Sequence, residues 1–306
     1  MTENKTNPLM CDPQSGMCEM PETAAASSGL KTIPAVKPVR IIYYTDPICS
    51  SCWGIEPQLR KLKSEYGDYI EIDYRMGGLL PDWSYNSGGI SKPSDVAHHW
   101  DEASLYYEMP IDGDVWLEDP LDSSYPSCIA MKAAQLQDKD KAVTFMRIMR
   151  EKLYLDKKNI AKWENISEAA ALANLDVALL KQDYMGQGKI YFEQDLALAR
   201  QLGVRGFPTM FFTDASDNRL MVYGAKPYQA YENAILELYP DAKKKQPVTT
   251  GNPLALFERY PTLTAKEYAV ILNHTTEVAT SILEQLVQSG SLDVKTIKTG
   301  KLYKRK

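Results

Sequence analysis

Hydrophobic and polar positions change their period several times along the chain, and each change predicts an element. Residues 39–45 (VRIIYYT) are β-branched and aromatic, which is typical of a buried strand. Residues 52–67 repeat apolar side chains at helical spacing, through Ile55 and Leu59, and residues 69–76 (YIEIDYRM) alternate as a second strand. Together these segments predict a β-α-β unit.

The middle of the chain has a helical period. Apolar residues recur three or four positions apart in residues 127–137, 142–155 and 163–175, and short polar segments separate the three runs. This is too much helix for a connecting loop. We therefore expect a helical insert at about residues 95–186.

Strand signals return after the insert. Residues 189–204 predict a helix, and residues 208–214 and 219–224 predict a hairpin joined by the turn sequence ASDN. A last helix should begin near Pro227. The order β-α-β, helical insert, α-β-β-α predicts one α/β domain over residues 39–240.

Two further segments flank that domain. Residues 1–38 are rich in Thr, Pro, Ser and Ala and poor in large apolar residues, so we expect a disordered tail. Residues 241–252 are charged and contain proline, which is typical of a linker. Residues 253–306 then predict a helix, a turn, a second helix capped by Thr276 and two alternating strands. This order resembles a winged helix.

Composition is that of an ordinary globular protein. Of 306 residues, 44% are hydrophobic and 25% are charged, and no stretch approaches the roughly 20 apolar residues needed to cross a bilayer. The N-terminal sequence lacks the apolar stretch of an export signal, so we expect a cytoplasmic protein that does not bind membranes. The net charge of −5 argues against a general polyanion binder.

Five cysteines carry the candidate chemistry, and Cys49 and Cys52 form a C-x-x-C motif between the first strand and the first helix. Exposed N–H groups and the dipole at a helix N-terminus stabilise a thiolate, so Cys49 is the candidate nucleophile. Cys52 is placed to release the mixed disulfide that Cys49 would form with a substrate. Half of a zinc site and two inert thiols are the alternatives. A zinc site needs four ligands, and the sequence has no suitably spaced second pair, so we expect no metal and no cofactor.

A proline far downstream supports the redox interpretation. Pro208 begins a predicted strand, where a cis bond would leave the backbone of Phe207 open to an extended peptide. A dithiol between strand and helix combined with such a proline is the thioredoxin arrangement. The sequences DPICSSCWGIEPQLRKLKSEYG, MGGLLPDW, YPSCIAMKAAQLQ and GFPTMFF resemble the DsbA-like branch of that superfamily, and within it the cytoplasmic group that contains FrnE and the ClpXP adaptor YjbH (SpxH).

The resemblance covers about residues 39–240. It implies a DsbA-like thioredoxin fold with a helical insertion, with Cys49 and Cys52 as the redox pair and Pro208 as the cis-proline. Two functions follow from it, because the group includes both. One is a thiol-disulfide oxidoreductase, with isomerase or reductase activity, that exchanges disulfides in protein or small-thiol substrates. The other is a redox-sensing adaptor that delivers a client to ClpXP protease.

Side chains close to the motif have two interpretations each. Trp53, together with Phe207 and Pro208, is a candidate substrate contact, although a tryptophan at this place is more often a packing residue. Glu56 and Asp46 could relay a proton or remain ordinary charges. We assign neither carboxylate to the chemistry.

The remaining cysteines are candidate auxiliary redox residues. Cys128 opens the apolar helix at 127–137 and is expected to be a small buried core residue. Cys11 and Cys18 flank a turn-forming segment of the tail, where they form either a tethered redox pair or two exposed thiols.

The C-terminal segment combines basic strands with a helix that lacks basic residues. The strands carry Lys295, Lys298, Lys301, Lys304, Arg305 and Lys306. These side chains could contact phosphates, but the second helix offers no Arg or Lys to a DNA groove. We therefore expect a protein-docking or packing module, with nucleic acid as the weaker alternative.

Overall fold

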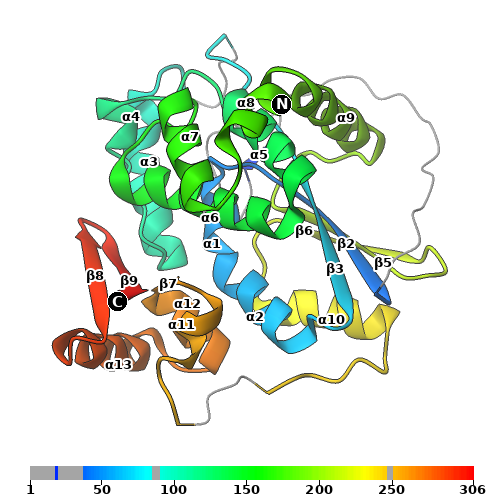
Figure 1. The fold of residues 1–306 in the computed structure, drawn as a ribbon. Helices are drawn as coiled ribbons and strands as arrows, with labels where there is room; N and C mark the ends of the chain where they lie inside the picture. Colours follow the sequence, from blue (N-terminus) through cyan, green and yellow to red (C-terminus); the bar gives the residue numbers. More distant parts are fainter. Residues whose placement is uncertain (1–17, 20–36, 85–89, 247–250) are drawn as a thin grey trace, which may run out of the picture.

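The computed structural model describes residues 18–19, 37–84, 90–246 and 251–306. Its centre is a four-stranded sheet with the strand order β3-β2-β5-β6 (Figure 1). The strands are β2 (Val39–Thr45), β3 (Ile70–Met76), β5 (Thr209–Thr213) and β6 (Arg219–Tyr223). β2 and β3 run parallel, whereas β5 pairs antiparallel with both β2 and β6. The strands predicted from the hydrophobic pattern are thus confirmed.

Burial along the strands follows their place in the sheet. β2 is buried at six of its seven residues, as expected for a central strand covered on both faces. Its register pairs Thr45 with Met76, and the amide of Gly77 donates to the Thr45 carbonyl (2.9 Å). The end of β2 that leads into the C-x-x-C motif therefore lies beside the start of the MGGLL segment.

Helices cover both faces of the sheet (Figure 1). On one face α2 (Glu56–Tyr66) contacts α10 (Tyr228–Leu238), and on the other α9 (Gln187–Gln201) contacts β3. The helical insert adds α3 (Ser94–Tyr107), α4 (Val115–Glu118), α5 (Tyr125–Gln137), α6 (Lys139–Asp156), α7 (Trp163–Leu172) and α8 (Val177–Met185). Three of them, α5, α6 and α7, correspond to the three predicted helical runs, whereas α3, α4 and α8 were not predicted individually.

The helix that follows the C-x-x-C motif is interrupted. The sequence pattern predicts one helix, but the structure has α1 (Ser50–Gly54) and α2, with Ile55 outside helical geometry at φ −93° and ψ 3°. Pro57 lies in the first turn of α2 and has no N–H to donate to the carbonyl of Trp53. Apolar spacing runs through the break because both helices turn the same face to the core.

The C-terminal unit contains the two helices and the hairpin that the sequence predicts, together with an unpredicted short helix and an unpredicted strand. Its elements are α11 (Ala255–Arg259), β7 (Thr262–Thr264), α12 (Ala265–Leu272), α13 (Thr276–Gln288), β8 (Leu292–Ile297) and β9 (Gly300–Arg305), with the sheet order β7-β9-β8. The cap of α13 is Thr275, which accepts from the Val278 amide, and not Thr276, whose hydroxyl donates to Glu108. The winged-helix assignment itself stays a prediction.

One short part of the N-terminal tail has a described backbone. Cys18–Glu19 form β1, which pairs antiparallel with β4 (Gly206–Phe207) and places Cys18 opposite Phe207. The expectation of a structureless tail is therefore wrong at these two residues. Cys11 lies outside the described residues.

Within the described ranges, the structure contains no helix with the length and apolar character required to span a membrane.

Candidate functional site

The dithiol lies where β2 ends and α1 begins. Cys49 is the N-cap of α1, and its Sγ accepts a hydrogen bond from the amide of Cys52 (3.2 Å). This is the contact that a helix N-terminus offers to an anionic sulfur. Both cysteines are completely buried. A substrate disulfide can therefore reach either sulfur only after a local movement of the surrounding segments.

The two thiols have opposite pKa shifts. Burial raises the pKa of Cys49, and the amide contact from Cys52 does not outweigh that effect. Burial also acts to raise the pKa of Cys52, but the hydrogen bond from Cys49 and the charge of Arg150 outweigh it and lower that pKa. The two thiols share a hydrogen bond, so they titrate as one pair, and Arg150 stabilises the anionic form of that pair. The thiolate on Cys49, expected from the helix terminus, stays a prediction.

Arg150 of α6 is the cation of this site and was missed in the sequence. Its side chain is 1% exposed, and its guanidinium donates to Thr45 Oγ1 (2.8 Å), the Asp46 carbonyl (3.2 Å) and Glu56 Oε2 (3.4 Å). A buried cation needs such partners because its desolvation is costly. The only signal for it in the sequence is an arginine within an apolar helical run.

Asp46 connects the segment before the motif to two distant segments. Its buried carboxylate accepts from the amides of Ile48 (3.0 Å) and Leu79 (2.7 Å) and from Ser124 Oγ (2.9 Å). Cys128 Sγ also donates to it (3.2 Å). Burial raises the pKa of Asp46 although these hydrogen bonds oppose the shift. Cys128 is thus the buried core residue that the sequence predicts, with its own pKa raised by burial and by Asp46.

The predicted proline feature is present in the structure. The Phe207–Pro208 peptide bond is cis. The Phe207 ring packs so closely on Gly77 that a Cβ there would lie 1.7 Å from Cζ of the ring, so the MGGLL segment requires glycine at this position. The backbone of Phe207, predicted to be open to an extended peptide, pairs with the chain's own Cys18.

Trp53 is a packing residue in this structure. It is fully buried, its indole N–H donates to the carbonyl of Pro110 (3.1 Å), and its ring stacks on Tyr154 at 5.4 Å. The guanidinium of Arg147 lies over the indole at 4.4 Å. The position of Trp53 therefore does not support a substrate contact, because no part of the ring reaches the surface.

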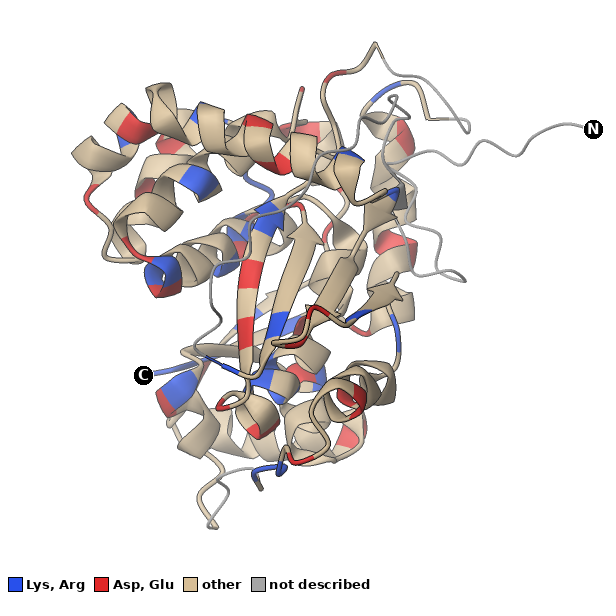
Figure 2. Cartoon of the chain, turned by 90° about the vertical axis from the view of Figure 1, so that its right-hand side faces the viewer, with Lys and Arg blue, Asp and Glu red and all other residues tan. Residues whose placement is uncertain are grey.

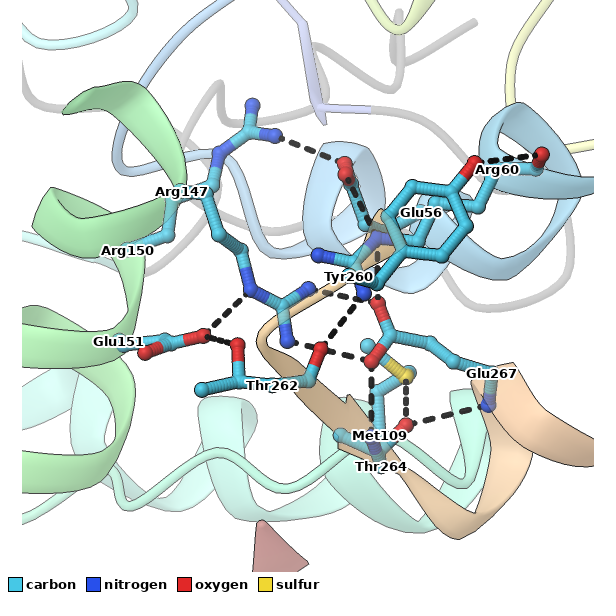
Figure 3. A network of polar contacts seen from close by, with 10 residues as sticks. All are labelled: Glu56, Arg60, Met109, Arg147, Arg150, Glu151, Tyr260, Thr262, Thr264 and Glu267. Atoms are coloured by element: carbon cyan, nitrogen blue, oxygen red, sulfur yellow. Dashed lines mark hydrogen bonds and ion pairs between the residues drawn. The ribbon is translucent and has the colours of Figure 1, made fainter. Parts of the chain in front are cut away.

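Alternating charges connect Arg150, the buried cation of the site, to the C-terminal unit (Figure 3). Glu56 pairs with Arg150 (3.4 Å) and with Arg60 (3.5 Å), and Arg60 pairs with Glu267 of α12 (3.2 Å). Arg147 binds the same Glu267 carboxylate through both nitrogens (2.6 and 3.1 Å). Burial would raise the pKa of Glu267, but the two guanidinium groups outweigh it and lower that pKa. An ion-pair network thus runs from Arg150 to α12.

Five of the six basic residues of the C-terminal hairpin pair with carboxylates of the same chain, and among the described residues the exposed Lys304 has no such pair. Lys298, between β8 and β9, contacts Asp101 (2.8 Å), Asp112 (3.3 Å) and Asp114 (2.7 Å). The other pairs are Lys295 with Asp156, Lys301 with Glu284, Arg305 with Glu258 and Lys306 with Asp293. These contacts favour the packing interpretation over phosphate binding, because the charges are already neutralised within the chain.

Comparison with known proteins agrees with this geometry. A thioredoxin family model, Thioredoxin_5, matches residues 43–233. The chain is 33% identical over 311 residues to "ClpXP adapter protein SpxH" of Halalkalibacterium halodurans. The match covers 99% of this chain and 98% of the relative. The chain belongs to the SpxH family of thioredoxin-fold proteins. SpxH of Bacillus subtilis is 30% identical over 273 residues, covering 88% of this chain and 89% of that protein.

A solved structure shares the fold of this SpxH-family chain but not its full length. Cytosolic disulfide reductase DsbM from Pseudomonas aeruginosa matches with a TM-score of 0.53 at 20% identity. The match covers 99% of DsbM but 65% of this chain. About a third of the chain therefore lies outside the shared DsbA-like fold, whereas the SpxH relatives match nearly all of it.

Proposed function

We propose that this chain is an adaptor that binds a client protein and delivers it to ClpXP, with Cys49 and Cys52 making the interaction responsive to oxidation. The observation that carries the proposal is the share of the chain that each group of similar proteins matches. Relatives named as ClpXP adapters match nearly the whole chain, including the C-terminal unit, whereas the DsbM reductase matches the DsbA-like part alone. We further propose that the protein acts in the cytoplasm.

Two features of the site support an adaptor over a turnover enzyme. Both sulfurs are buried, whereas an exchange enzyme needs its nucleophile within reach of a substrate disulfide. The thiolate is also balanced by Arg150, which the ion-pair network connects to Glu267. Oxidation of the dithiol to a disulfide would remove its negative charge. Glu56 would then be the anion that remains paired with Arg150. The C-terminal unit is thereby placed to respond to the oxidation state.

Degradation by purified ClpXP tests the proposal. A cell extract would be incubated with ClpXP, with and without the full chain, and protein levels followed by quantitative mass spectrometry. We expect a small set of proteins whose degradation needs the chain, and the same set to be stable with a chain ending at residue 246. Degradation that is identical with and without the full chain would overturn the proposal.

Thiol-disulfide exchange is the second candidate function. Two features favour it. The C-x-x-C motif lies at a helix N-terminus, and the cis-proline Pro208 follows β4. Substoichiometric chain should then reduce insulin disulfides over many turnovers with glutathione as reductant. The Cys52→Ser variant should accumulate mixed disulfides at Cys49, whereas Cys49→Ser should trap none. Equal trapping by both variants would contradict these roles.

A further inference from the structure

The outer edge of β3 is open over part of its length. β3 is the last strand on one side of the sheet, and the Val39 amide bonds to the carbonyl of Tyr69. Odd-numbered residues of β3 therefore bond inward to β2, and the N–H and C=O groups of even-numbered residues point outward. Gln135 closes this edge at the Tyr74 carbonyl (3.0 Å), and Asp195 closes it at the Met76 amide (2.9 Å).

Besides the Tyr74 amide, the outward groups that remain are those of Ile70 and Ile72. Among the described residues, neither has a side-chain or loop partner for its outward backbone groups. Proteins normally blunt such an edge, because unpaired N–H and C=O groups are a template for another strand. Here only the end near Met76 is blocked, so the first half of β3 can still pair with an added strand.

A groove of about 650 Å³ follows this edge. Ile72 lines it together with Leu136 of α5, Val143 of α6 and Tyr191 of α9. The side chains of Leu136 and Tyr191 are 40% and 36% exposed, so apolar surface is available beside the open backbone groups. Backbone pairing supplies affinity and neighbouring apolar surface supplies selectivity when an extended peptide adds to a sheet edge.

The groove is basic although the whole chain carries a net charge of −5. In Figure 2, Lys and Arg segments lie on helices on both sides of the central sheet. The charged residues that line the groove are Lys37, Arg40, Lys63, Arg75, Lys132, Lys139 and Arg259, with Glu71, Asp73 and Asp140. Asp73 and Asp195 pair with Arg40, Arg75 and Lys132, which leaves two carboxylates against three cations. The cations left over include Lys139 and Arg259, both exposed.

We propose that this edge binds an extended acidic segment of a partner protein, which adds as a strand beside Ile70 and Ile72. Apolar side chains of the segment would pack on Leu136 and Val143, and its carboxylates would meet Lys139 and Arg259. Electrostatic complementarity selects an acidic segment over a basic one. The proposal is independent of the dithiol and holds whether the chain is an adaptor or an exchange enzyme.

A labelled peptide of alternating Glu and Val, with the seven-residue length of β3, is the probe. Its binding would be followed by fluorescence anisotropy at low salt, and amide exchange at Ile72 by NMR. We expect saturable binding with slowed exchange of the Ile72 amide. The double variant Lys139→Glu, Arg259→Glu should weaken binding about tenfold or more. Lys226→Glu is the matched control, because Lys226 is exposed and follows β6 at the opposite edge of the sheet.

Two altered peptides make the test specific. Replacing Glu by Lys should abolish binding, and N-methylation of alternate amides should weaken it about tenfold without changing the charge, because it removes the strand-pairing donors. Equal binding of the Lys peptide or of the N-methylated peptide would overturn the proposal. So would absence of binding by the Glu-Val peptide, or an equal effect of the double variant and Lys226→Glu.

Discussion

At the scale of single residues, Arg150 is the cation that acts on both thiols of the dithiol. Its guanidinium is held by Thr45, Asp46 and Glu56 and acts on Cys52 through its charge. Because the site is buried, this charge is weakly screened, and it stabilises the thiolate form of the pair. The electrostatics of the site therefore depend on a residue about a hundred positions downstream of the motif.

We expect Arg150→Gln to raise the pKa at which the dithiol first loses a proton by about 1 unit or more, because an adjacent cation favours the charged form of a thiol. The thiolate absorbance in the ultraviolet, followed against pH, measures this value. Arg150→Lys keeps the charge and should restore most of the shift. Arg147→Gln is the matched control, since Arg147 is equally buried but bonds to Glu267 and Glu151. An unchanged titration in Arg150→Gln would contradict this role.

Residues with a local signature could be found from the sequence, and residues defined by distant contacts could not. Cys49 and Cys52 follow from their spacing and from the strand-to-helix change around them, and Pro208 from its place at a strand start. Arg150 has no local signature, because its partners lie on β2 and at the start of α2. Trp53 shows the converse. Its place next to the motif suggested a substrate contact at the surface, but its side chain is buried.

At the scale of elements, the start of α12 combines two tasks in one side chain. Glu267 completes a capping box, in which its carboxylate accepts from the Thr264 amide (2.8 Å) and its own amide donates to Thr264 Oγ1 (3.1 Å). The same carboxylate binds Arg60 and Arg147. The signal Thr-x-x-Glu predicts a helix start but not the ion pairs, because the two arginines belong to other helices.

The Glu267→Gln variant separates these tasks. Glutamine can still serve the capping box, but it leaves Arg60 and Arg147 without their shared carboxylate. We expect a loss of about 3 kcal/mol in the free energy of unfolding, as for other buried pairs that lose one partner. Thr264→Ala, which removes the cap hydroxyl, should cost about 1 kcal/mol. Urea unfolding measures both values, and equal costs would show that the cap alone matters.

Acid should break the ion pairs of Glu267 with Arg60 and Arg147. The pKa of Glu267 lies below its ordinary value of 4.5 because Arg147 and Arg60 outweigh burial. A carboxyl with a lowered folded-state pKa contributes stability that is full above its unfolded pKa and is lost as the pH falls through the folded one. The protection of α12 amides, expressed relative to their intrinsic exchange rates at each pH, should therefore decrease below about pH 4.5. The Glu267→Gln chain should lack this part of the pH dependence, and identical profiles would contradict the assignment.

Element types were largely predictable, but their ends and their tertiary contacts were not. Alternation and helical spacing identified β2, β3, the β5–β6 hairpin and the insert helices. The break at Ile55 was missed because apolar spacing continues through it, although Pro57 was a visible signal. β7 has three residues, too few to show a period, and it becomes a strand only by pairing with β9.

At the scale of the whole molecule, the C-terminal hairpin holds the loop after α3, which packs on α1 beside the dithiol. Thr299 Oγ1 donates to the Ile111 carbonyl (2.7 Å), and Lys298 binds the carboxylates at residues 101, 112 and 114. The preceding part of that loop contacts α1, through Tyr107 and Ser51 (2.9 Å) and through Pro110 and Trp53. Chain far from the motif in sequence thereby restricts access to the two sulfurs.

Loosening the hairpin tip should therefore expose the dithiol. Lys298→Glu places a further negative charge against three aspartates, which repels the tip from the loop while leaving the Glu267 contacts intact. We expect hydrogen exchange in residues 108–114 to increase and alkylation of Cys49 and Cys52 to accelerate about tenfold, because buried thiols react through local opening. Alkylation rates resolved by mass spectrometry measure the effect.

The hairpin also supplies the matched control for that experiment. Lys301→Glu makes the same change of charge on the same hairpin, but Lys301 pairs with Glu284 inside the C-terminal unit (2.7 Å). This variant should leave both the loop and the thiol reactivity nearly unchanged. Cys128, buried against Asp46 away from the hairpin contacts, is an internal reference whose alkylation should stay slow in every variant. If Lys298→Glu and Lys301→Glu accelerate alkylation equally, the hairpin does not control access to the dithiol through this loop.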